Sequence, residues 1–254
     1  MSLSSQSDTV KDDSARGFGV RSATDLPTLE VRSLGLVPYG IALEMQRELV
    51  AARQAGEIPD RLLLLEHTAV ITVGVRGPGR RNHVLASPAE LRDRGIEILD
   101  VHRGGDVTYH GPGQLVGYPV IDLKPHRCDV HRYVQDLEEV LIQTVASFGV
   151  LAGRVAGLTG VWVGNDKLAA IGVRLSRWVT SHGFALNVTT NLDHFRFIVP
   201  CGLEGRGVTS LGRLIGEVPP RPELEAVVAD AFAQVFGRRI SEGSAEPRAA
   251  NSRE

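Results

Sequence analysis

The sequence is poor in cysteine and in aromatic residues, and it has no long apolar run. Its two cysteines, Cys128 and Cys201, are too few for a disulfide framework. Aromatic residues make up 5% of the chain and hydrophobic residues 43%, so the predicted core is aliphatic. No apolar stretch approaches the ~20 residues of a membrane span, and the N-terminal residues lack the apolar segment of a secretion signal. These absences predict a cytoplasmic protein.

An excess of charge of one sign is also missing. The formal net charge is -2, so the composition gives no general basis for binding nucleic acid, which requires a basic face that neutralises phosphates. The histidines and cysteines show neither a His-Glu-x-x-His pattern nor paired Cys-x-x-Cys motifs. We therefore predict no metal and no cofactor.

The length of 254 residues suits one domain with one substantial core. Residues 1–27 and 241–254 are rich in small and charged residues and nearly free of large apolar side chains, so we expect two disordered tails. Residues 28–240 are expected to form a single catalytic domain.

Within that domain, apolar spacing predicts helices and strands without a regular βαβα alternation. Helices are expected from Pro38 to about Ala55, after Ser87, from Asp129 to Gly149 and over Pro222–Phe236. The expected strands cover 29–34, 62–66, 70–74, 96–101 and 115–123, followed by an antiparallel meander over 160–164, 167–175 and 178–188. The pattern predicts an α/β (α+β) fold, a mixed sheet covered by helices on one side.

The stretch from Arg103 to Tyr118 concentrates glycines and reactive polar side chains. Glycines let the backbone adopt positive φ and let a ligand lie against backbone N–H groups. We interpret this stretch as a binding loop.

Two further residues are candidates for chemistry. Cys201 lies between Pro200 and Gly202, a setting that can expose a thiol, although free cysteine is also a common buried residue. Lys167 begins an apolar strand, where poor solvation would favour loss of its proton; the alternative is a solvated lysine at a turn. A nearby ammonium favours the thiolate, which is the nucleophilic form of cysteine.

The loop over 103–118, the Lys167–Gly172 segment, the His182–Val188 segment and the Pro200-Cys201-Gly202 motif resemble the octanoyl (lipoyl) transferases that make protein lipoate. The resemblance covers about Val31 to Leu214. It implies the catalytic-domain fold of biotin and lipoate protein ligases, with a largely antiparallel sheet. It also implies that Cys201 carries an acyl thioester and that Lys167, 34 residues before it, is its catalytic partner.

The resemblance further implies a set of residues that line the octanoyl pocket. They are Arg103, Gly104, Gly105, Asp106, Val107, Thr108, Tyr109, His110, Ala170, Ile171, Gly172, Gly183, Phe184 and Ala185. The implied donor is octanoyl-acyl carrier protein. The implied acceptors are lysines in lipoyl domains of 2-oxoacid dehydrogenase E2 subunits and in the glycine cleavage H protein.

Several roles stay open at the level of the residues. His110 is either a structural histidine bonded to a loop carbonyl or a proton carrier, and backbone N–H groups near Gly104 and Gly105 are candidate oxyanion donors. Arg103 is expected to fix the loop through carbonyls or an acidic side chain. The segment Gly77–His83 lacks P-loop spacing, and its arginines suit either a basic edge for an acidic carrier or a solvated loop.

Two other functions fit the same fold. An ATP-dependent lipoate or biotin ligase would use a lysine in the region of Lys167 but needs no nucleophilic cysteine. A non-catalytic module would bind acylated carriers without turnover. Cys201 and Lys167 together favour the transferase.

Overall fold

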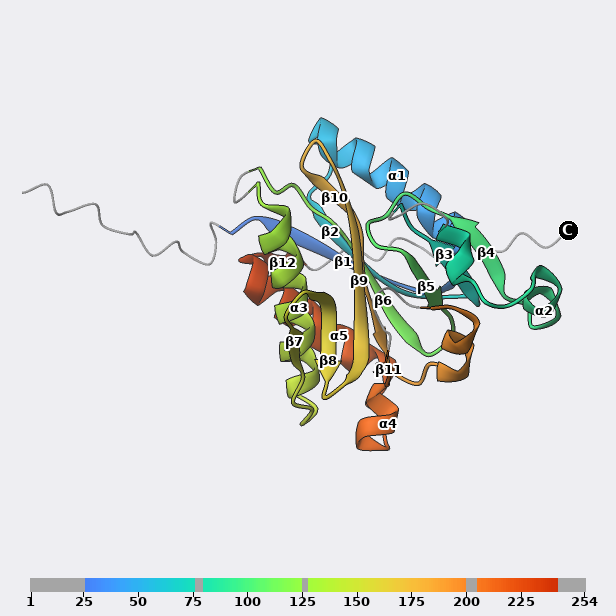
Figure 1. The fold of residues 1–254 in the computed structure, drawn as a ribbon. Coiled ribbons are helices and arrows are strands. Elements are labelled where there is room, and N and C mark those ends of the chain that lie inside the picture. The colour runs from blue at the N-terminus through green and yellow to red at the C-terminus, as the bar shows by residue number, and fades with distance from the viewer. Residues whose placement is uncertain (1–25, 76–79, 125–127, 200–204, 242–254) are drawn as a thin grey trace, which may run out of the picture.

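A computed structural model describes residues 26–75, 80–124, 128–199 and 205–241, and shows a central nine-stranded sheet (Figure 1). The order across the sheet is β12-β1-β2-β6-β10-β9-β8-β7, and β11 pairs with β9. These strands are β1 (Thr28–Val37), β2 (Asp60–His67), β6 (Gln114–Val120), β7 (Gly153–Val155), β8 (Leu158–Val163), β9 (Asp166–Ser176), β10 (Val179–Asn187), β11 (Gly207–Val208) and β12 (Arg239–Ser241). Three pairs, β12–β1, β1–β2 and β11–β9, are parallel and the others are antiparallel. The predicted mixed, largely antiparallel sheet and the meander of β8, β9 and β10 are confirmed.

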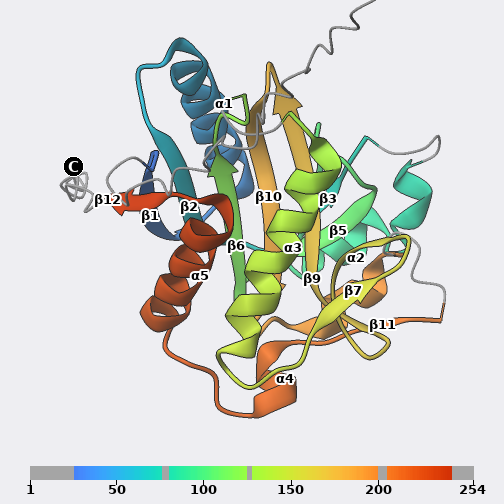
Figure 2. The ribbon, with the colours of Figure 1, turned by 90° about the vertical axis from the view of Figure 1, so that its left-hand side faces the viewer.

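Helices lie on both faces of this sheet, so the expectation of helices on one side is wrong. The long helices α3 (Val130–Ala146) and α5 (Arg221–Phe236) pack side by side on one face (Figure 2), while α1 (Tyr39–Ala55) packs against β10 and β6 on the other (Figure 1). The alternation along β2 explains this arrangement. Leu62 and Leu64 join the core under α3 and α5, whereas Leu63 and Leu65 join a second cluster with Ala42 of α1. A run of four leucines thus supplies both layers.

Local capping signals in the sequence are confirmed at two helices. The Asp129 carboxylate accepts a hydrogen bond from the Arg132 backbone N–H at 3.0 Å at the start of α3. The Ser87 hydroxyl accepts from the Glu90 N–H at 3.2 Å and starts α2 (Pro88–Asp93). Both side chains satisfy N–H groups that have no partner within the helix.

A second, three-stranded sheet packs beside α1 and has the order β4-β3-β5. It consists of β3 (Val70–Val73), β4 (Glu97–Asp100) and β5 (Val107–His110). The sequence stretch interpreted as one long binding loop therefore contains all of β5 and the start of β6. Four residues flanked by glycines give too short a period-2 signal to be read as a strand, and pairing with β3 decides the structure.

Several short elements were not predicted. They are β7, β11, β12, α4 (Leu211–Ile215) and the two 3₁₀ segments Arg80–His83 and Leu192–Phe197. Each has only two to six residues, and some depend on partners distant in sequence: β12, for example, pairs with β1 from Thr28↔Arg239 to Glu30↔Ser241.

The two predicted tails lie almost entirely outside the described residues, and their disorder stays a prediction. Among the described residues, no helix combines the length and apolar character needed to cross a membrane.

Candidate functional site

A cavity of about 800 Å³ lies where the two sheets meet. Every residue predicted to bind the acyl group lines it except Tyr109, and Lys167 lines it too. The wall comes from the 103–108 stretch, β9, β10, α3 and the β7–β8 hairpin. Residues from Tyr39 to Val208 are therefore brought together around one space.

Tyr109 lies on the opposite face of β5. Its ring packs edge-on against Phe195, with centroids 5.6 Å apart, and its hydroxyl is 2.8 Å from Nδ1 of His194. Burial raises the pKa of Tyr109 to about 12. Because side chains alternate along a strand, Tyr109 supports the small sheet while its neighbours Thr108 and His110 line the cavity.

Arg103 ties the glycine loop to the small sheet. Its Nη1 donates to the Gly104 carbonyl at 3.0 Å, and its Nη2 donates to the carbonyl oxygen of Thr72 at 2.9 Å. The side chain is buried, and a charged guanidinium satisfied by carbonyl oxygens is a strong anchor. This arrangement matches the loop-fixing role expected from the sequence.

The backbone N–H of Gly104 is engaged within the protein. It donates to the Val173 carbonyl of β9 at 2.9 Å. A Cβ at Gly172, the preceding residue of β9, would lie 3.0 Å from the Gly104 carbonyl and 3.1 Å from Cδ of Arg103. The loop thus lies directly on β9. The Gly104 N–H, one of the candidate oxyanion donors, is already hydrogen-bonded within the protein.

His110 is held in one tautomer by a chain of amides. Asn187 Nδ2 donates to the Thr209 carbonyl at 3.0 Å, so its Oδ1 is the atom that accepts from Gln114 Nε2 at 2.9 Å. Gln114 Oε1 then faces Nδ1 of His110 at 2.8 Å and requires a proton on that nitrogen. Burial lowers the pKa of His110 well below 6.5, and the positive charge of Arg103 lowers it further. His110 is therefore neutral, with Nδ1–H as a donor to a side-chain carboxamide.

A buried group of aromatic side chains next to His110 was not found from the sequence. Nδ1 of His67 donates to the Val37 carbonyl at 2.8 Å, and Nε2 accepts from the Tyr118 hydroxyl at 2.7 Å. Tyr39 stacks on His110, with ring centroids 5.8 Å apart. Burial lowers the pKa of His67 to about 4. Tyr118, at the end of the glycine-rich stretch, belonged to a sequence motif, whereas Tyr39 and His67 did not.

His182 completes this group from β10. Its backbone has φ 55, and its N–H donates to Oε1 of Gln46 at 2.7 Å. Burial, and then the positive charge of Arg103, lowers the pKa of His182 to about 3. His182 and His110 thus line the cavity as neutral imidazoles, and the His67 ring packs against that of His110, with centroids 5.7 Å apart.

Lys167 is half-buried in β9, between Trp162 of β8 and Val208 of β11. Its Nζ lies 4.8 Å from the centroid of the Trp162 ring. Lys167 therefore belongs to the sheet and to the cavity wall.

Cys201 lies outside the described residues. On either side of it, Val199 N–H donates to the His83 carbonyl at 2.8 Å, and Asn165 Nδ2 donates to the Gly205 carbonyl at 3.0 Å. Gly205 is thus bonded to Asn165, which lies two residues before Lys167 in the sequence.

The loop over Gly77–His83 is described only from residue 80. Arg81 forms an ion pair with Asp100, and Nδ1 of His83 donates a hydrogen bond to the Asp106 carboxylate of the cavity wall. These two side chains thus have partners within the protein, and the described residues contain no cluster of three metal-ligating side chains.

Comparison with known proteins decides the family. The sequence model of the lipoyl protein ligase A/B catalytic domain matches residues 38–233. An octanoyltransferase from Solibacter usitatus is 50% identical over 84% of this chain and 96% of its own length. The chain belongs to the octanoyltransferase family. Another octanoyltransferase, from Myxococcus xanthus, is 47% identical over 82% of this chain, which spans 60% of that relative.

The octanoyltransferase family shares its fold with lipoate ligases. A bipartite lipoate protein ligase from Thermoplasma acidophilum superposes with a TM-score of 0.66 at 16% identity, over 87% of this chain and 88% of its own. The fold implied by the sequence resemblance is confirmed. This chain is an acyltransferase of protein lipoylation, and the cavity beside Lys167 is the candidate active site.

Proposed function

We propose that the protein transfers an octanoyl group from octanoyl-acyl carrier protein through a thioester on Cys201 to a lysine of a lipoyl domain. The family assignment supports the transfer of octanoyl or lipoyl groups. The observation that carries the finer proposal is that Lys167 lines the same cavity as the residues expected to bind the acyl chain. We place the reaction in the cytoplasm, without a cofactor.

In the first half-reaction, the Lys167 ammonium stabilises the Cys201 thiolate, which attacks the thioester carbonyl of the donor. A new carbon–sulfur bond forms, the bond to the phosphopantetheine sulfur breaks, and that sulfur takes a proton from Lys167. One thioester replaces another, so the step needs no ATP.

In the second half-reaction, the amine of the carrier lysine attacks the Cys201 thioester. Neutral Lys167 accepts the proton that the attacking amine loses, and Cys201 leaves as a thiolate. An amide replaces a thioester, which makes the step downhill. Lys167 thus serves in both directions of proton transfer and returns to its starting state.

The cavity suits an acyl chain more than a charged ligand. Its wall combines Ile171, Val173 and Phe184 with imidazoles held neutral, and Arg103 is satisfied by carbonyl oxygens. Each methylene in such a pocket gives about 1 to 3 kcal/mol of discrimination.

The proposed acceptors are lipoyl domains of 2-oxoacid dehydrogenase E2 subunits and the glycine cleavage H protein. A structural neighbour at 16% identity is described together with its E2 lipoyl domain. Purified lipoyl domain and H protein, each with its acceptor lysine replaced by arginine in a control, test this choice by octanoylation in vitro.

Intact mass spectrometry after incubation with octanoyl-acyl carrier protein tests the intermediate. A hydroxylamine-labile gain of about 126 Da on the native chain, absent from Cys201→Ser, is expected. An active native enzyme without this adduct would rule out the thioester route. A requirement for ATP and free octanoate would assign the chain to the ligase reaction.

A further inference from the structure

Trp162 is buried next to the candidate active site, and no hydrogen bond of its indole accounts for its position. Its side chain belongs to a residue with 2% exposure, and its Nε1 has no hydrogen-bond partner among the described residues. A buried indole N–H usually has a partner. The contacts of the Trp162 indole with neighbouring charged groups are made by the face of its ring.

Two cations lie against that ring. Nζ of Lys167 is 4.8 Å from the ring centroid, and Cζ of Arg206 is 5.3 Å from it. Both distances are within the range of a cation–π interaction. Lys167 is the cross-strand partner of Trp162, and Arg206 immediately precedes β11, the strand on the other side of β9.

An irregularity in the sheet creates this pairing. The β8–β9 register shifts between Val161, which faces Ala169, and Trp162, which faces Lys167, so Leu168 is the extra residue. A bulge of this kind redirects side chains, and here it brings the lysine onto the indole.

The stem of Lys167 is confined as well. A Cβ at Gly160 would lie 3.4 Å from Cε of Lys167 and 2.6 Å from the Ala169 carbonyl. Gly160 has φ 126, a conformation that side chains disfavour. Glycine at this position leaves room for the lysine to pass.

The acidic groups nearby are Glu138 and Asp166, and the Glu138 carboxylate is hydrogen-bonded within the protein. Glu138 of α3 accepts from the Gly160 N–H at 2.9 Å and from Nε of Arg154 at 3.0 Å. Asp166 lies beside Gly207, where a Cβ would be 2.2 Å from its Oδ1.

We infer that Trp162 is a positioning residue that holds the Lys167 ammonium at the cavity wall, and that Arg206 opposes that ammonium beside the same ring. The inference rests on the proposed role of Lys167. The indole favours the charged lysine, whereas a second cation disfavours it. Trp162 and Arg206 together fix the position of the Lys167 amine without holding its proton. This suits an amine that must release and accept a proton in each cycle.

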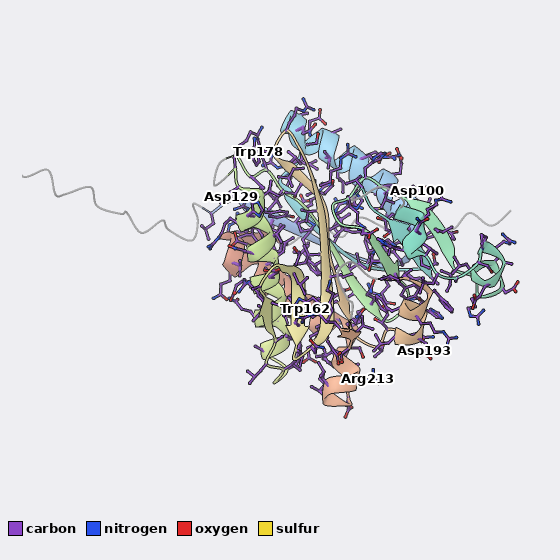
Figure 3. All side chains as sticks on the ribbon, viewed as in Figure 1. Asp100, Asp129, Trp162, Trp178, Asp193 and Arg213 are labelled. Atoms are coloured by element: carbon purple, nitrogen blue, oxygen red, sulfur yellow. The ribbon has the colours of Figure 1, made fainter. Side chains whose placement is uncertain are left out.

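Tryptophan fluorescence tests the contact without using activity. The chain has two tryptophans, and Figure 3 shows Trp178 at the upper end of the β9–β10 hairpin and Trp162 on β8 in the lower half. Trp178→Phe leaves Trp162 as the single fluorophore, whose emission responds to a charge near the ring. A pH titration of this variant is expected to show one transition that Lys167→Met abolishes.

Arg206→Gln in the same background is expected to move the transition upward by about one pH unit. Arg213→Gln, an exposed arginine on α4, is the matched loss of charge and should leave it in place. A transition that survives Lys167→Met, or one that Arg206→Gln does not move, would overturn the inference.

The pH dependence of kcat/KM gives the functional test. Trp162→Leu should move its alkaline limb to lower pH by about one unit, Arg206→Gln should move it to higher pH, and Trp162→Phe should keep most of the native profile. A merely structural role would lower activity without opposite shifts. If Lys167→Met keeps native activity, the proposed function of Lys167 fails. If Lys167→Met is inactive but Trp162→Leu and Arg206→Gln leave the alkaline limb in place, only the present inference fails.

Discussion

Nε2 of Gln114 donates to Oδ1 of Asn187 at 2.9 Å and so links β6 to β10 at the cavity wall. The same carboxamide fixes the proton of His110 on Nδ1. The buried Gln114 carboxamide therefore connects the pairing of β6 with β10 to the tautomer of His110.

Gln114→Leu is expected to leave His110 and Asn187 without this partner inside the protein. An unsatisfied buried polar group costs about 1 to 3 kcal/mol, so the free energy of unfolding should fall by about 2 to 4 kcal/mol. Urea denaturation measures it. Gln234→Leu on the exposed side of α5 is the control and should change it by less than about 0.5 kcal/mol. Equal effects of the two variants would contradict the role assigned to Gln114.

Asp60→Ala should be among the most destabilising single changes. Its carboxylate is buried and accepts from Nε of Arg53 and Nε of Arg238, each at 2.8 Å, and Arg238 is itself buried. Removing one member of a buried ion pair costs about 3 to 5 kcal/mol, because the other charge is left uncompensated.

The matched control for Asp60→Ala is Asp100→Ala, which removes an acidic partner of the exposed Arg81. An exposed pair contributes about 0 to 1 kcal/mol. Thermal and urea unfolding of both variants should therefore separate them clearly, and similar losses would count against the buried network.

The protein is expected to lose stability as the pH falls from about 6.5 toward 4. Burial lowers the pKa of His67 to about 4 and that of His182 to about 3, from an ordinary value of 6.5. Between those values the unfolded chain binds protons that the folded chain does not, so unfolding becomes easier as the pH drops. Each histidine contributes a slope of up to about 1.4 kcal/mol per pH unit.

Urea unfolding over this range, in the native chain and in His67→Gln, measures the effect. The variant should show a slope smaller by about one histidine. His131, exposed on α3, supplies the control His131→Gln, which should keep the native slope. An unchanged slope in His67→Gln would show that this imidazole is not held neutral.

Gly172→Ala should disturb the glycine loop without unfolding the domain. The new methyl group would approach the Gly104 carbonyl to 3.0 Å and Cδ of Arg103 to 3.1 Å, so the loop must move by a few tenths of an ångström. A displacement of this kind at a substrate-positioning wall is expected to lower kcat/KM by about tenfold to a hundredfold.

Gly153→Ala in β7 is the strand control for this change, because a Cβ there meets no atom within 4 Å. Steady-state octanoylation of a lipoyl domain compares the two variants. Native kinetics in Gly172→Ala would mean that catalysis does not depend on the position of the loop that packs on β9.

Much of the fold followed from local signals. The Asp129 cap, the Ser87 cap with Pro88 and the three apolar segments of the meander each act within a few residues, and each prediction was confirmed. The alternation within Leu62–Leu65 was equally local, but deciding that both faces are covered required knowing where α1 packs.

The site divides in the same way. Glycine-rich and lysine-containing segments could be found because each motif is contiguous in sequence. Tyr109 was placed in the pocket with the rest of Arg103–His110 by family resemblance, which does not tell which face of a short strand each residue presents. The Trp162–Lys167 pair depends on a register shift, and the His67–Tyr118 bond joins strands β2 and β6. Such contacts are set by tertiary pairing, which no local pattern encodes.

The edge position of β12 has a consequence for synthesis on the ribosome. Until residues 239–241 leave the exit tunnel, β1 has an open edge, and Asp60 lacks the guanidinium of Arg238. Every described residue that lines the cavity is translated earlier, between residues 39 and 208. A chain that ended just ahead of Arg238 would keep every described residue of the cavity wall, but it would leave the edge of β1 open to pairing with a strand of another molecule.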